Sequence, residues 1–121
     1  MTAEQKLELD KILNSITIAG PYTKTKLKAR AIKHYKKLWA DTPIMLKNID
    51  NASEKQIEQW MVNYIRHKLT GYDKALARIN EFVPNGYEIL KFSILDKISC
   101  MYPFLKDECE RQKAKLSCRI W

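Results

Sequence analysis

The chain contains little glycine and little proline, and it lacks any long uninterrupted apolar run. Three glycines and four prolines in 121 residues are too few for the many turns of a β-sandwich or barrel, while 45% apolar residues argue against disorder. The first residues carry acids at Glu4 and Glu8, so we expect no secretory signal, no membrane span and a cytoplasmic protein. A chain of this length can bury one core, which predicts a single helical domain over residues 1–121.

Cysteine is also scarce, and its spacing does not match the usual zinc motifs. Cys100, Cys109 and Cys118 follow one another at intervals of nine residues, whereas structural zinc sites normally include a Cys-x-x-Cys or a closely spaced His pair. An odd set of thiols in an intracellular protein is typical of reduced, buried side chains. The sequence therefore predicts no metal site, and no motif in it calls for a cofactor.

Apolar residues recur at helical spacing along most of the chain, and no stretch of useful length alternates as a strand does. Thr2 followed by Gln5, and Ser53 followed by Gln56, are typical of capping boxes at helix starts. We expect helices over about residues 3–18, 24–40, 53–69, 72–83 and 87–101, with a last one opening at Pro103. Residues 43–51 are predicted as a loop with at most one helical turn. The predicted fold is all-α, an irregular bundle of about five helices with residues 87–101 at its centre.

Acidic residues are missing from one quarter of the chain. Eight lysines and arginines and no Asp or Glu lie between Lys11 and Ala40. The other residues hold equal numbers of acids and bases, so the formal net charge of +8 arises in this segment alone. This local excess is the most informative feature of the sequence.

Residues 24–39 place the excess charge on one side of a predicted amphipathic helix. At about 100° per residue, Leu27, Ala31, Tyr35 and Leu38 form an apolar face that meets the core. Cations at i, i+4, i+7 and i+11 lie on the opposite face. The predicted binding residues on and beside that face are Lys24, Lys26, Arg30, Lys33, Lys36 and Lys37.

A row of like charges without interposed acids destabilises a helix slightly, which favours a surface that meets an anionic partner. The row is mostly lysine and, apart from Arg30, lacks the Arg, Asn and Gln donors that read base edges. It predicts mainly sequence-independent contact with the DNA or RNA backbone by a small accessory or regulatory protein without chemistry of its own. Two alternatives stay open. In the first, the lysines form a solvated face or a face neutralised by acids of the same fold. In the second, the chain is an inhibitor or adaptor module of the mobile-element type that docks on an acidic protein surface.

Two further modes of nucleic-acid contact are compatible with the sequence. The junction after Thr70 joins two predicted helices, as in a helix-turn-helix, with Lys74 and Arg78 outward on the second helix. The same junction is common in ordinary helical bundles. Tyr22 and Trp121 lie outside the predicted apolar stripes and are the candidates for stacking on single strands.

One helix junction also gathers a possible second site, which consists of Arg66, His67, Tyr72 and Asp73. A catalytic interpretation makes His67 a general base oriented by Asp73, with Arg66 holding a phosphate and Tyr72 as a donor. A structural interpretation has Thr70 capping the following helix and Asp73 pairing with Arg66 or His67. Because local physics already explains these residues, we expect no catalysis.

The pair Arg66-His67, followed by Thr70, Tyr72 and Asp73, resembles the Arg-His and Thr-x-Tyr-Asp pattern of a family of uncharacterised bacterial and fungal proteins. The resemblance covers residues 65–73. That family is described only as a domain of unknown function, so the resemblance implies no activity, cofactor or partner.

Overall fold

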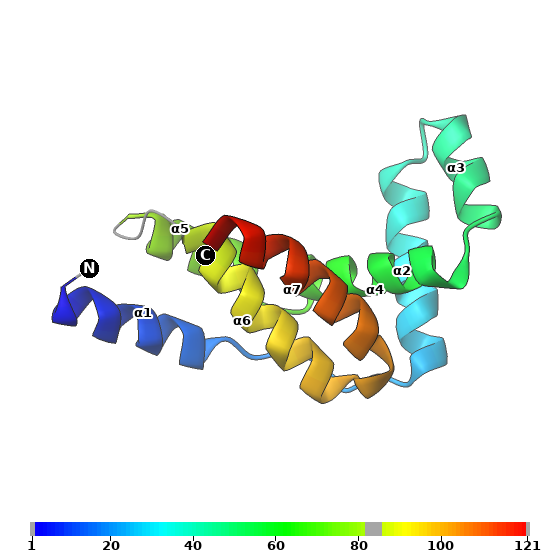
Figure 1. Cartoon of the computed structure of the whole chain (residues 1–121). Helices are drawn as coiled ribbons and strands as arrows, with labels where there is room; N and C mark the ends of the chain where they lie inside the picture. Colours follow the sequence, from blue (N-terminus) through cyan, green and yellow to red (C-terminus); the bar gives the residue numbers. More distant parts are fainter. Residues whose placement is uncertain (1, 82–85, 121) are drawn as a thin grey trace.

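The computed structural model describes residues 2–81 and 86–120, with side chains as far as Leu116 in the last helix (Figure 1). All regular structure in these residues is helical, which confirms the all-α class. The elements are α1 (Ala3–Ser15), α2 (Lys24–Leu38), α3 (Pro43–Asp50), α4 (Glu54–Lys68), α5 (Tyr72–Asn80), α6 (Gly86–Met101), the 3-10 turn η1 (Pro103–Leu105) and α7 (Lys106–Ile120). The number of helices exceeds the expected five or so. None of the helices in the described ranges is long and apolar enough to cross a membrane.

The prediction of a loop over residues 43–51 is wrong, because these residues form α3. Pro43 occupies the first turn of α3, where the missing N–H of proline costs no hydrogen bond. Ile49 is only 5% exposed, and α3 packs on α2. The sequence argument treats Pro43 as a stop signal alone, whereas a proline equally favours a helix start.

The first helix is shorter than predicted because a lysine from α6 binds its end. α1 begins with the predicted capping box at Thr2, including both reciprocal hydrogen bonds. It ends at Ser15 instead of continuing to residue 18. There the Lys97 ammonium donates hydrogen bonds to the carbonyls of Leu13 and Ile16, which would otherwise lack partners at the helix end.

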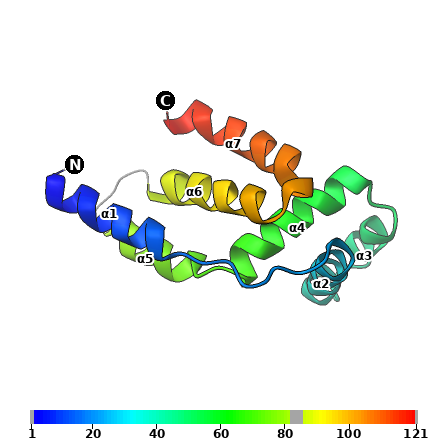
Figure 2. The same cartoon turned by 90° about the horizontal axis from the view of Figure 1, so that it is seen from below.

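α6 is the centre of the fold, as predicted, and packs against α4, α5, α7 and η1. Figure 2 shows α6 between α7 on one side and α4 on the other. Its completely buried side chains are Leu90, Ile94, Leu95 and Ile98. Pro103, predicted to open the last helix, opens η1 instead, and α7 begins three residues later at Lys106.

α2 and α3 project together from one end of the molecule (Figure 1). Leu27 and Ala31 are completely buried where α2 crosses α4. The ring of Trp60 on α4 packs against those of Tyr35 and Trp39, with centroid separations of 5.6 and 5.8 Å. Leu38, predicted to belong to the apolar face of α2, is 61% exposed.

Two of the three cysteines have described side chains, and their environments differ. Cys109 is buried, and this burial raises the pKa of its thiol to about 12, which makes it unreactive near neutral pH. Cys100 is exposed on α6. The side chain of Cys118 lies outside the described residues.

Candidate nucleic-acid interface

The central cations of the predicted site lie on the exposed side of α2. Thr23 caps the helix, its hydroxyl accepting a hydrogen bond from the Lys26 N–H at 3.2 Å. Burial of Leu27 and Ala31 against α4 then sets the rotation of α2 and turns the opposite face to solvent. We refer to the exposed cations as the α2 basic stripe: Lys26, Arg30, Lys33 and Lys37. Within the described part of the chain, no member of the stripe forms an ion pair with an acid.

The two flanking lysines of the predicted site are paired with acids from neighbouring helices. Lys24 Nζ lies 3.8 Å from Glu54 Oε1 at the start of α4, and Lys36 Nζ lies 3.9 Å from Asp50 Oδ1 at the end of α3. All four side chains are more than half exposed, so solvent screens both pairs, and each contributes at most about 1 kcal/mol. Compensation by acids of the same fold therefore applies to Lys24 and Lys36 and does not reach the α2 basic stripe.

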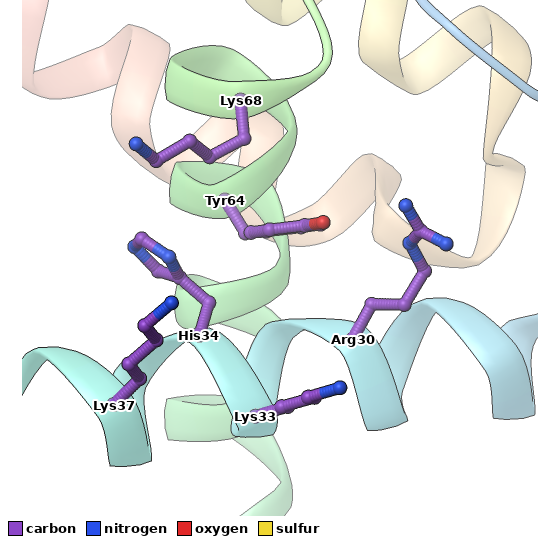
Figure 3. Close-up of a pocket in the computed structure, with 6 residues that line it drawn as sticks. All are labelled: Arg30, Lys33, His34, Lys37, Tyr64 and Lys68. Atoms are coloured by element: carbon purple, nitrogen blue, oxygen red, sulfur yellow. The ribbon is translucent and has the colours of Figure 1, made fainter.

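α4 adds two side chains to this surface and forms a pocket against α2, shown in Figure 3. The pocket has a volume of about 350 Å³, and we refer to it as the α2–α4 pocket. It is lined by Arg30, Lys33, His34, Lys37, Tyr64 and Lys68, with no acid among them. Tyr64 and Lys68 are absent from the predicted site, because Tyr64 belongs to the apolar stripe of its helix. Their i, i+4 spacing, which places them on one helix face, is the sequence signal that would have linked them.

His34 connects the two walls of the α2–α4 pocket. Its ring centroid lies 5.4 Å from that of Tyr64 on α4 and 5.1 Å from that of Tyr35 on α2. Partial burial and the positive charge of Lys68 lower the pKa of His34 from the ordinary value of 6.5. The imidazole is therefore mostly neutral at pH 7. An anion in the pocket favours the protonated form, so anion binding and protonation of His34 are coupled.

Arg30 lies over the ring of Tyr22 and faces the hydroxyl of Tyr64. Its guanidinium carbon lies 4.5 Å from the ring centroid of Tyr22, and Lys26 Nζ lies 5.6 Å from the same centroid. Hydrogen bonding with Tyr64 raises the pKa of Arg30 further above its ordinary value. Tyr22, a predicted stacking residue, therefore contacts two cations of α2. The other predicted stacking residue, Trp121, lies outside the described residues.

The possible second site brings Arg66, His67 and Tyr72 together, with Arg66 and Tyr72 buried and His67 exposed. Arg66 is only 7% exposed, with its guanidinium carbon 5.2 Å from the Tyr72 ring centroid and its Nη2 3.2 Å from His67 Nε2. Arg66 Nε and the Tyr72 hydroxyl are buried without hydrogen-bond partners among the described residues. Burial raises the pKa of Tyr72 to about 12, so its phenol keeps its proton near pH 7.

Asp73 does not join this cluster, and the prediction that Thr70 caps the following helix is wrong. The Thr70 hydroxyl donates back to the Arg66 carbonyl, and Gly71 precedes α5 without any side-chain cap. Asp73 is exposed and forms no ion pair with Arg66 or His67, all of which are described. Its charge opposes, without reversing, the lowering of the His67 pKa by burial and by Arg66. The hydrogen bond by which Asp73 would orient His67 as a general base is not formed here.

The second helix of the possible helix-turn-helix is engaged by the N-terminal helix. α5 packs on α1, and Arg78 Nη2 lies 2.9 Å from Glu8 Oε1. Lys74 is exposed. A recognition helix has to enter a groove with its outer face free. Because α1 occupies part of the space beside α5, this packing disfavours α5 as a recognition helix.

No protein-family model matches the chain, and no curated protein or solved structure is significantly similar to it. The resemblance of residues 65–73 to a family of uncharacterised proteins stays a prediction.

Proposed function

We propose that the protein binds the phosphate backbone of DNA or RNA through the α2 basic stripe together with Lys68 of α4. One observation carries the proposal: the stripe and Lys68 form a continuous cationic surface that receives no ion pair from the acids of the described chain. An anionic partner relieves the repulsion between neighbouring cations on a folded surface. Binding to a nucleic acid is also favoured because counterions are released from its backbone.

The composition of the surface favours contact with the backbone over reading of sequence. From Lys26 to Lys37 the stripe extends about 16 Å along the helix axis, a length that spans several backbone phosphates. Arg30 alone in the stripe has a planar fork of donors, and its guanidinium lies over the Tyr22 ring. Lysines act as point charges toward phosphates, so we expect binding that differs little between sequences.

The test is a mobility shift on DNA and RNA of mixed sequence at several salt concentrations. Neutralising about four phosphates on duplex DNA predicts a slope of log K against log salt near −3.6, which is a loss on the order of 100-fold between 50 and 200 mM. Failure to retard either nucleic acid at about 50 mM salt, with the protein shown to be folded, would refute the proposal.

A second candidate function is docking on an acidic protein, as in an inhibitor or adaptor, and one observation favours it. Leu38 and Ile44 are 61% and 75% exposed near the end of α2 and the start of α3, and Leu38 adjoins Lys37 and Lys68 in a shallow depression. Apolar side chains rimmed by cations suit a protein interface. A Leu38→Ser variant separates the two functions. If the protein binds the nucleic-acid backbone by charge, the variant has the same affinity for nucleic acid as the wild type.

A further inference from the structure

The α2–α4 pocket gathers positive charge around one place on the surface. A row of lysines along one helix spreads its charge over the length of that helix. Four permanent cations line it, together with His34 and Tyr64. They come from two helices that cross, so they line one pocket from two walls, with Lys37 and Lys68 on one side of Tyr64 and Arg30 on the other (Figure 3). Each internal phosphate of a nucleic acid carries a single negative charge. The pocket therefore offers more positive charge than one internal phosphate needs.

The donors on the pocket walls suit an anion with several acceptor oxygens. Figure 3 shows the ammonium group of Lys37 directed toward His34, that of Lys68 on the same side of Tyr64 as His34, and the hydroxyl of Tyr64 directed toward Arg30. A phosphomonoester carries between about −1.5 and −2 charges at pH 7 and three terminal oxygens that accept hydrogen bonds. A volume of about 350 Å³ also leaves room for the sugar attached to the phosphate.

The acids that pair with lysines of α2 do not compete for the pocket. Glu54 and Asp50 lie in ion pairs with Lys24 and Lys36, outside the residues that line it. An incoming dianion thus meets cations without having to displace a carboxylate. This distinguishes the pocket from an ordinary surface depression bordered by mixed charges.

We propose that the α2–α4 pocket binds a phosphomonoester, with Arg30, Lys37 and Lys68 as its charged donors and His34 and Tyr64 as further donors. On a nucleic acid this group is the phosphate at a strand end, and that part of the proposal rests on the proposed function. The same chemistry is present in a free mononucleotide, which is the other source of the ligand.

Two paired probes distinguish these sources. The first pair is one oligonucleotide with either a phosphate or a hydroxyl at its ends, tested at each end separately in a mobility shift. The second pair is adenosine 5′-monophosphate and adenosine, added while the NMR signals of the His34 ring are observed. We expect the phosphorylated oligonucleotide to bind about tenfold more tightly, the effect of one additional charge-assisted hydrogen bond. We also expect the monophosphate, and not adenosine, to shift the His34 signals.

A pair of variants shows whether the preference arises in the pocket. Lys68→Gln removes a cation of the pocket and is expected to abolish the preference for a terminal phosphate. Lys26→Gln removes a cation of the α2 basic stripe that does not line the pocket, and it should weaken binding of both oligonucleotides equally. Far-ultraviolet circular dichroism of both variants verifies that they are folded.

The outcomes separate this proposal from the proposed function. Equal binding of phosphorylated and unphosphorylated ends, with no response of His34 to the monophosphate, overturns the phosphomonoester site and leaves backbone binding intact. A response to the monophosphate without binding of any oligonucleotide refutes the proposed function and assigns the site to a free mononucleotide. No response to any probe overturns both.

Discussion

His34 on α2 lies against Tyr64 on α4, with ring centroids 5.4 Å apart and ring planes inclined by 49°. This contact joins the α2 basic stripe to Lys68 of α4 across a helix crossing. The candidate interface is therefore a property of two packed helices. Its affinity for an anion should depend on individual cations, on the protonation of His34 and on the packing that keeps α2 in place.

Removing one cation of the stripe should reduce the electrostatic part of nucleic-acid binding by one phosphate contact. For Lys33→Ala we expect weaker binding to every sequence alike, with the slope of log K against log salt reduced in magnitude by about one. The matched control is Lys6→Ala on α1, which lowers the net charge equally but lies outside the pocket and the stripe. A slope that is the same for both variants would remove Lys33 from the interface.

Nucleic-acid binding should strengthen as the pH falls from 8 to 5.5. The His34 pKa is lowered in the free protein by burial and by Lys68, and a bound anion raises it again. The extra attraction is present below the pKa of the bound state and is lost as the pH rises through it. The charged groups facing His34 are all cationic, Arg30, Lys33 and Lys37 from α2 and Lys68 from α4, and backbone phosphates do not titrate in this range.

The pH dependence is measured by repeating the mobility shift at constant ionic strength. His34→Gln should flatten the profile, because glutamine cannot acquire the charge. The second histidine provides the control: His67→Gln should leave the profile unchanged, since His67 is not among the residues that line the pocket. Equal pH profiles for the wild type and His34→Gln would contradict the coupling.

Replacing Lys97 should loosen the end of α1. Its ammonium donates to the carbonyls of Leu13 and Ile16, and methionine fills similar space without a donor. We expect Lys97→Met to lower the free energy of unfolding by about 1 kcal/mol, the low end of the penalty for an unpaired acceptor, because these hydrogen bonds are only partly buried. Urea unfolding measures the loss, and Lys115→Met at an exposed position of α7 should stay within about 0.5 kcal/mol of the wild type.

Replacing Arg66 should, by contrast, cost little stability. The guanidinium is buried without an acidic partner among the described residues, and its contact with the Tyr72 ring offsets only part of the desolvation. For Arg66→Met we expect a free energy of unfolding within about 1 kcal/mol of the wild type, on either side. Ile65→Ala, at the completely buried neighbouring position, should lose about 2–5 kcal/mol in the same urea experiment. A comparable loss for Arg66→Met would show that its contacts stabilise the fold.

The features that sequence could predict are those decided by residues close together along the chain. The hydroxyls of Thr2 and Ser53 cap α1 and α4 because a cap and its backbone donor are three residues apart. The α2 basic stripe follows from helical periodicity, which places residues four apart on one face. The central position of α6 follows from apolar residues on nearly all its sides.

Other features depend on residues that are distant in sequence, and only the tertiary structure decided them. Lys97 ends α1 from 81 residues away, and Tyr64 and Lys68 join the basic surface because α4 crosses α2. Asp50 and Glu54 neutralise the flanking lysines and leave the stripe uncompensated. Charge and periodicity along one helix are local properties of the chain. Which charges meet partners, and which converge on a pocket, depends on how helices pack, and that packing minimises the free energy of the whole chain.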